Sequence, residues 1–137
     1  MPTKRIFLVD DNVVVRSYLR RLFESRSDFE ILGEADNGRE AVEKAEKLKP
    51  DLIILDLVMP VMSGLDAAPL LKELLPETPI ILFTQQEGSE VELLAQAAGI
   101  DAVVSKSQVA SELVLKAEAL LGSTQQRQNR AKFRDAS

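Results

Sequence analysis

The side chains best suited to chemistry are three carboxylates, one hydroxyl and one ammonium group, and each stands at the end of a short apolar run. Asp10 and Asp11 follow the first run, Asp56 the third, Thr84 the fourth and Lys106 the fifth. If the runs are parallel strands, their carboxyl ends meet at the sheet edge where α/β proteins bind ligands. Crowded carboxylates repel unless a cation neutralises them, and Mg²⁺ suits few carboxylates beside a phosphate. The pattern predicts a magnesium site flanked by Thr84 and Lys106.

The elements that must position these residues are five apolar runs alternating with amphipathic segments. Strands are expected at 6–9, 29–32, 52–55, 79–83 and 102–104. In the first helix, Val15, Tyr18, Leu19 and Leu22 fall at helical spacing and are expected to face inward. Five strands alternating with five helices predict an α/β, doubly wound fold with a parallel sheet covered on both faces.

Helix boundaries are predicted from local signals. Asn37 to Glu40 and Ser89 to Glu92 read as capping boxes, and the last helix is expected over 109–121. Pro69 removes a backbone donor, so the third helix is expected to start late enough to hold it near the first turn.

Composition excludes several classes of function. With 137 residues, 45% of them hydrophobic, the chain fits one globular domain. It has no cysteine and no histidine, which excludes disulfides, thiolate metal sites and a phosphohistidine on this chain. No apolar stretch approaches the length of a membrane span, so a cytoplasmic, membrane-free location is expected.

Charge is unevenly distributed along the chain. The net charge is −5, but residues 123–137 carry four basic and one acidic side chain, which leaves −8 for the remainder. An acidic domain of this kind does not favour direct nucleic-acid binding. We expect a domain over 4–121 and a polar, basic tail or linker over 122–137.

The motifs resemble the receiver domain of two-component response regulators over residues 4–121. The resemblance rests on Leu-Val-Asp-Asp-Asn at 8–12, Asp-Leu-Val-Met-Pro-Val-Met-Ser-Gly-Leu at 56–65, Thr84 and Lys106. It implies a flavodoxin-like sheet with strand order 2-1-3-4-5. It also implies that Asp56 is the phosphoacceptor and that Mg²⁺, or Mn²⁺, is bound by Asp11, Asp56 and the backbone carbonyl of Val58, with Asp10 acting through water.

The resemblance also implies partners and a mode of signalling. The phosphoryl donor would be a sensor histidine kinase or a phosphotransfer protein, and the chain would catalyse only its own phosphorylation and dephosphorylation. Thr84 would donate its hydroxyl to the phosphoryl group and Lys106 would pair with it. The switched surface would bind a downstream protein or a second copy through the last two strand–helix units.

Three positions depart from the family pattern. Val103 replaces an aromatic switch residue, and Ser107 replaces the proline that usually follows the lysine through a cis bond. Gln85 replaces a small residue after the threonine and could either screen the phosphoryl group from water or orient that water. Phosphoryl acceptance is expected to survive these changes, while output coupling is expected to differ.

Three other functions are compatible with parts of the pattern. The chain could be the receiver half of a transcription regulator whose DNA-binding output domain is absent here, although a stand-alone receiver is the preferred interpretation. A haloacid dehalogenase-type phosphatase also uses a strand-end aspartate, but its Asp-x-Asp motif would need a second aspartate where Val58 stands. A flavodoxin-like cofactor binder lacks support because no phosphate loop follows the first strand.

Overall fold

The computed structural model describes residues 3–122, which form five strands and five helices in alternation. The predicted tail lies outside the described residues, apart from Gly122, the last residue described. The strands are β1 (Lys4–Val9), β2 (Phe29–Ala35), β3 (Leu52–Leu55), β4 (Ile80–Thr84) and β5 (Ala102–Ser105). The helices are α1 (Val13–Glu24), α2 (Gly38–Leu48), α3 (Gly64–Leu74), α4 (Ser89–Ala97) and a C-terminal helix over 110–122.

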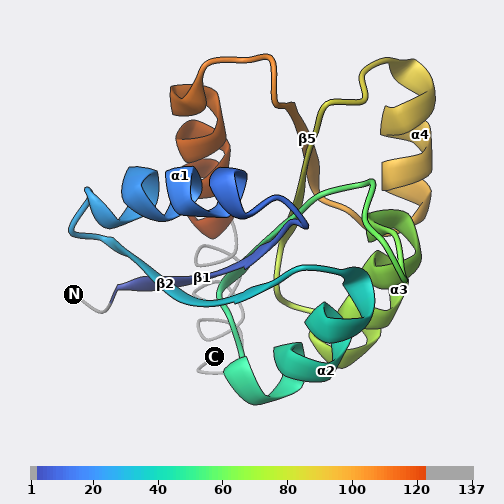
Figure 1. Cartoon of the computed structure of the whole chain (residues 1–137), viewed down its shortest axis with the longest axis horizontal. Coiled ribbons are helices and arrows are strands. Elements are labelled where there is room, and N and C mark those ends of the chain that lie inside the picture. Colours follow the sequence, from blue (N-terminus) through green and yellow to red (C-terminus); the bar gives the residue numbers. More distant parts are fainter. Residues whose placement is uncertain (1–2, 123–137) are drawn as a thin grey trace, which may run out of the picture.

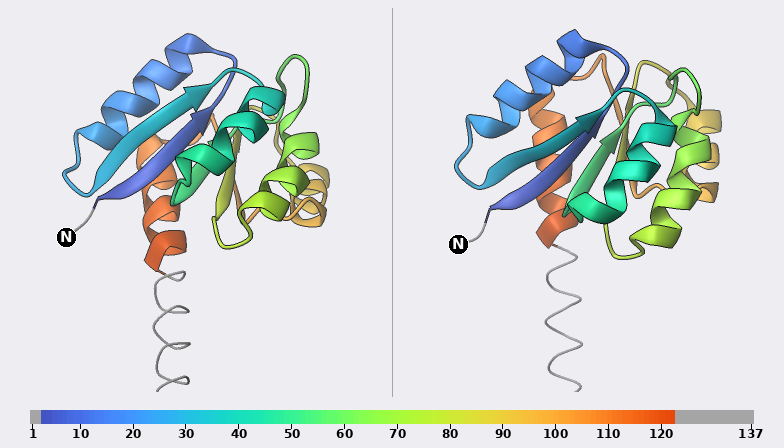
Figure 2. Two further views of the ribbon diagram at one scale, coloured as in Figure 1. Left: turned by 90° about the horizontal axis from the view of Figure 1, so that it is seen from below. Right: turned by 60° about the horizontal axis from the view of Figure 1, so that its bottom comes forward.

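All strand pairs are parallel, and the sheet order is β2-β1-β3-β4-β5, which confirms the predicted doubly wound fold. The chain winds outward in opposite directions from β1 and β3, and such a switch point is where these sheets bind ligands. Val9 pairs with Leu55 in register. Strands β1 and β3 therefore end side by side (Figures 1 and 2). The register places Asp10 and Asp56, the next residue of each strand, next to each other.

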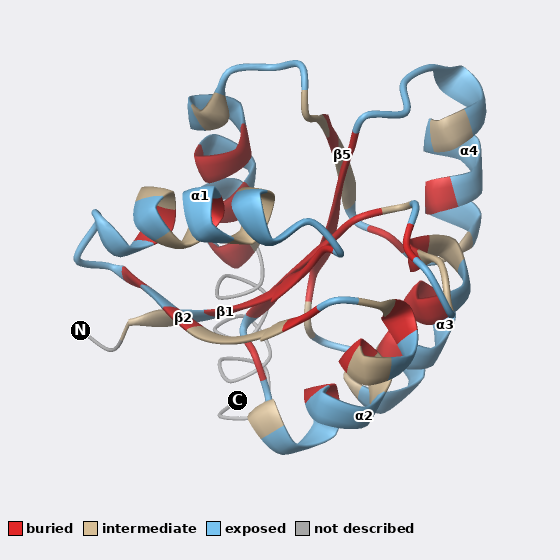
Figure 3. Ribbon diagram, in the orientation of Figure 1, coloured by how far each residue is buried: buried red, intermediate tan, exposed pale blue. Residues whose placement is uncertain are grey.

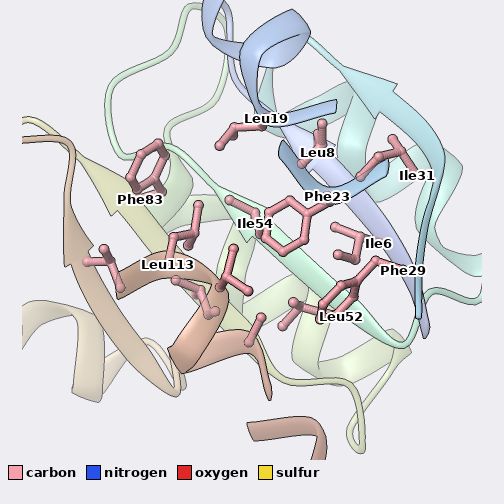
Figure 4. Close-up of a cluster of buried hydrophobic side chains, with 14 of the residues drawn as sticks. Ile6, Leu8, Leu19, Phe23, Phe29, Ile31, Leu52, Ile54, Phe83 and Leu113 are labelled. Atoms are coloured by element: carbon pink, nitrogen blue, oxygen red, sulfur yellow. The ribbon is translucent and has the colours of Figure 1, made fainter. Parts of the chain in front are cut away.

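The sheet separates two hydrophobic cores. Helix α1 and the C-terminal helix cover one face, and α2, α3 and α4 cover the other (Figure 1). The strands β3 and β4 are buried throughout, and β1 is buried from Ile6 onward (Figure 3), which explains why these segments are continuously apolar. On the first face, Phe23 of α1 packs edge-on against Phe29 with ring centroids 5.2 Å apart, in a cluster that includes Leu19 and Leu113 (Figure 4).

The structure corrects three local predictions. Tyr18 is exposed, because the buried stripe of α1 runs through Leu19 and Phe23 and leaves Tyr18 outside it. Ser89 is the first helical residue of α4 and not its cap, since Gly88 occupies that position without a side-chain hydrogen bond. Pro69 lies in the middle of α3 and not in its first turn, because Ser63 caps the helix and starts it at Gly64.

The other predicted cap is present. The side chain of Asn37 accepts a hydrogen bond from the Glu40 N–H at 2.9 Å. The return bond differs from a regular capping box, because the Glu40 carboxylate accepts from the N–H of Asp36. Helix α2 therefore begins where its sequence indicates.

Candidate metal centre

A cavity of about 240 Å³ lies at the carboxyl ends of β1, β3 and β4 and beside the turn after β5. The structure brings together there all the residues singled out for metal and phosphoryl contact, together with Gln85. Two residues not singled out from the sequence, Asn12 and Gln86, complete the lining. The cavity is lined by Asp10, Asp11, Asn12, Asp56, Val58, Thr84, Gln85, Gln86 and Lys106.

Three carboxylates converge in this cavity. One oxygen atom from each of Asp10, Asp11 and Asp56 lies within 4.8 Å of the others. Asp10 and Asp56 are buried, whereas Asp11 is exposed. A cluster of carboxylate oxygens, two of them withdrawn from water, is the donor chemistry that Mg²⁺ and Mn²⁺ prefer.

Asp10 is fixed by hydrogen bonds at its backbone N–H and at both of its carboxylate oxygens. Its N–H donates to the Ala35 carbonyl at 3.1 Å, its Oδ1 accepts from the Asn12 N–H at 2.9 Å, and its Oδ2 accepts from Lys106 Nζ at 2.8 Å. Within residues 3–122, Asp11 has no side-chain hydrogen bond or ion pair. Asp11 is therefore the carboxylate whose lone pairs remain free.

Asp56 lies against Lys106. Its Oδ2 is 3.2 Å from Lys106 Nζ, and its Oδ1 accepts from the Leu57 N–H at 2.8 Å. Burial and the charge of Asp10 raise the pKa of the Asp56 carboxyl, and they outweigh the ion pair with Lys106. Burial acts to lower the pKa of Lys106, but the hydrogen bond and charge of Asp10, with those of Asp56, raise it overall.

Thr84 connects the loop after β4 to the turn after β5, on the side of the cavity away from β1. Its carbonyl accepts from the Lys106 N–H at 2.8 Å, and its Oγ1 accepts from the Gln86 N–H at 3.2 Å. The hydroxyl proton is not used by that bond, so it remains available to a ligand in the cavity.

Gly64 allows the loop after β3 to fold back on the phosphoacceptor candidate. A Cβ atom at Gly64 would lie 2.1 Å from the backbone oxygen of Asp56, which no side chain can tolerate. The Gly64 N–H donates to the Leu57 carbonyl at 2.9 Å and closes the loop. The glycine of the 56–65 motif is therefore required by close backbone approach.

The three departures from the family pattern all lie on the Thr84 side. Gln85 is exposed at the wall of the cavity. Val103 is half-buried and borders a second hollow of about 280 Å³ together with Val91. No cis peptide bond occurs within the described residues, so Ser107 follows Lys106 through a trans bond.

Sequence reasoning missed two groups of residues that contact these loops. Arg16 donates to the Asp10 carbonyl, and the Glu87 carboxylate accepts from the hydroxyls of Ser105 and Ser107. Glu87 is far from Ser105 and Ser107 in the chain, and Arg16 stands outside any motif, so no local pattern indicated these contacts.

Comparison with known proteins identifies the family. The family model described as response regulator receiver domain matches residues 6–118. Response regulator protein VraR of Staphylococcus saprophyticus is 38% identical over 114 residues, which are 82% of this chain and 54% of the relative. Transcriptional regulatory protein YdfI of Bacillus subtilis is 48% identical over 80 residues, which are 58% of this chain and 37% of the relative. The chain thus spans about half the length, or less, of these relatives.

Solved structures agree with this assignment. A two-component response regulator of the LuxR family from Aurantimonas superposes with a TM-score of 0.85 at 36% identity, covering 88% of this chain and 86% of that one. The response regulator domain of Thermotoga maritima CheB gives a TM-score of 0.75 at 31% identity, covering 93% and 97%. Within the described part of the chain, no helix is both long and apolar enough to cross a membrane. This chain belongs to the response regulator receiver domain family.

Proposed function

We propose that this chain is the phosphoacceptor receiver of a two-component phosphorelay, in which Asp56 accepts a phosphoryl group in a Mg²⁺-dependent step. The observation that carries the proposal is the position of the Asp56 carboxylate. It is 7% exposed, it borders the cavity, it forms an ion pair with Lys106, and it has an oxygen within 4.8 Å of oxygens of both Asp10 and Asp11. A buried carboxylate with its own cation and a dication site is equipped to take up a phosphoryl group.

The three carboxylates differ in how they would bind the metal. Asp11, Asp56 and the Val58 carbonyl would hold Mg²⁺ or Mn²⁺ directly. Asp10 already accepts from Asn12 and Lys106, so it would contribute through water. Bound metal supplies positive charge that neutralises the oxygens of the transferred group.

The residues of this chain then perform the transfer. A carboxylate oxygen of Asp56 attacks phosphorus, and the bond from phosphorus to the donor histidine nitrogen breaks, leaving an acyl phosphate on Asp56 and the electron pair on that nitrogen. Lys106 pairs with the phosphoryl oxygens, and the Thr84 hydroxyl donates to them. The added charge draws the Thr84 loop inward and biases the partner-binding surface.

The phosphoacceptor can be tested by mass. Incubation with acetyl phosphate and Mg²⁺ is expected to add one phosphoryl group to the wild-type chain and none to Asp56→Asn. Asp66→Asn, the same substitution at an exposed aspartate of α3, is the matched control and should still gain the group. Phosphorylation of Asp56→Asn would sink the assignment.

The proposal extends to the phosphoryl donor and the output partner of this chain. The donor would be a histidine kinase or a phosphotransfer protein in the cytoplasm. The output would be an unknown downstream protein, or a homodimer formed through the last two strand–helix units, which are β4 with α4 and β5 with the C-terminal helix. A second candidate, the receiver half of a transcription regulator, is favoured by the relative named as a transcriptional regulatory protein, of which this chain spans only 37%.

A further inference from the structure

Arg16 links the end of β1 to β2 from its position on α1. One guanidinium nitrogen donates to the Asp10 carbonyl, and Nε donates to Glu34 Oε1 at 2.9 Å. The Arg16 side chain is only 16% exposed and that of Glu34 30%. This is a partly desolvated fork of hydrogen bonds and not a solvated surface pair.

Glu34 is itself fixed in place. Its Oε2 accepts from Arg20 at 2.6 Å and 3.1 Å, and its backbone carbonyl accepts from Lys44 Nζ at 2.9 Å. Burial acts to raise the pKa of the Glu34 carboxyl, but the hydrogen bonds from Arg20 and Arg16 lower it overall. Glu34 therefore remains ionised and holds the Arg16 guanidinium in one orientation.

We propose that Arg16 is a positioning residue for the metal centre, an inference that rests on the proposed function. The Asp10 carbonyl belongs to the peptide that joins Asp10 to Asp11. By fixing that carbonyl, Arg16 sets the orientation of the peptide and with it the direction of the Asp11 carboxylate. Asp11 has no other side-chain anchor within the described residues, so its position depends on its backbone.

Two effects of Arg16 on metal binding have opposite signs. As a positive charge near three carboxylates, Arg16 opposes the binding of a dication, so its removal would tighten binding by charge alone. As a positioning residue it favours binding, because groups that orient metal ligands contribute about tenfold to hundredfold in affinity. The direction of the change on removal therefore separates the two roles.

The experiment compares Mg²⁺ titrations of wild type, Arg16→Ala and Arg20→Ala. Arg20 lies one turn further along α1 and also pairs with Glu34, but among the described residues its other partner is Glu24 and not Asp10, so its removal loosens Glu34 without deleting a bond to the Asp10 carbonyl. We expect Arg16→Ala to raise the Kd about tenfold, Arg20→Ala to leave it within about twofold of wild type, and Arg16→Lys to restore part of the loss.

A loss of stability alone does not imitate this result, because it lowers the unfolding free energy of both alanine variants and leaves the Kd of the folded protein unchanged. If Arg16→Ala fails to fold, Glu34→Ala, which removes the acceptor that orients Arg16 but leaves Arg16 in place, should still weaken Mg²⁺ binding. An unchanged or lower Kd in Arg16→Ala would overturn the role of Arg16 only. A wild-type chain without Mg²⁺ binding would overturn the metal site and this inference together.

Discussion

The two sides of the cavity are built in different ways. On the carboxylate side, Asp10 and Asp56 follow buried strands, and each has one carboxylate oxygen bonded to a backbone N–H close to it in the chain and the other bonded to Lys106. On the switch side, the loops after β4 and β5 are joined through a clasp of exposed side chains, in which the Glu87 carboxylate accepts from the hydroxyls of Ser105 and Ser107.

This difference matches the two tasks of the proposed function. A chemical site gains from anchors that are buried and cannot rearrange, because catalysis of phosphoryl transfer is mainly positioning. A switching segment must have two arrangements of similar free energy, and segments with exposed hydrogen bonds and few buried contacts supply them. The clasp flanks Lys106 on both sides, so it connects the chemistry to the loop that must move.

The largest expected effect would break the carboxylate side alone. Asp11→Ala is expected to abolish measurable Mg²⁺ binding, because it removes the carboxylate with free lone pairs. Glu87→Ala is the control on the switch side and should leave the Mg²⁺ titration unchanged. Calorimetric titration of both variants checks the comparison, and equal losses in the two would show that the sides are not independent.

The next effect concerns the backbone of the carboxylate side. Gly64→Ala is expected to lower the unfolding free energy by about 3 kcal/mol, since the new Cβ would meet the Asp56 carbonyl and backbone cannot rotate away. Gly122→Ala, with nothing within 4 Å of the added atom, is the control and should leave stability unchanged or raise it by up to about 1 kcal/mol, because alanine favours helix over glycine. Urea unfolding without metal measures both, and similar stabilities would contradict the close approach.

The carboxylate side could be predicted from sequence because its signals are local. An aspartate directly after an apolar run lies at the carboxyl edge of a parallel sheet, and the sheet order puts β1 next to β3. Gly64 lies in the 56–65 motif that begins with Asp56, so it too could be recognised from the sequence. The fold could be predicted for the same reason, since short apolar runs of three to five residues between amphipathic segments leave few other arrangements.

What could not be predicted depends on contacts between distant residues. Tyr18 and Phe23 are both compatible with an inward face of α1, and only packing against Phe29 decides between them. The bond from Arg16 to Glu34 spans 18 positions and that from Glu87 to Ser105 also spans 18. Such pairs have no periodic pattern, so the supports of the site become visible only in the structure.

A smaller effect tests the electrostatics of the carboxylate side. Burial and the charge of Asp10 raise the pKa of Asp56 above its ordinary 3.8. Ionised Asp56 therefore lowers the unfolding free energy at pH values above the folded-state pKa. This cost disappears below pH 3.8, where the carboxyl is protonated in both the folded and the unfolded state. Asp56→Asn is therefore expected to raise the unfolding free energy at pH 7, with a gain that fades as the pH falls. Urea unfolding of metal-free protein from pH 3 to 7 measures it, with Asp66→Asn as control. A gain that grew towards acid would contradict the sign.

The smallest effect tests whether the clasp exists in solution. Hydrogen bonds from Ser105, and to a smaller extent from Ser107, lower the pKa of Glu87 below its ordinary 4.5. The clasp is therefore fully formed above pH 4.5 and opens as the pH falls through the lowered pKa of Glu87. Carboxyl-carbon NMR titration is expected to show the Glu87 pKa returning towards 4.5 in Ser105→Ala, and by less in Ser107→Ala. An unmoved titration in Ser105→Ala would mean that the loops after β4 and β5 are not joined through Glu87, and the contrast between the two sides would then rest on burial alone.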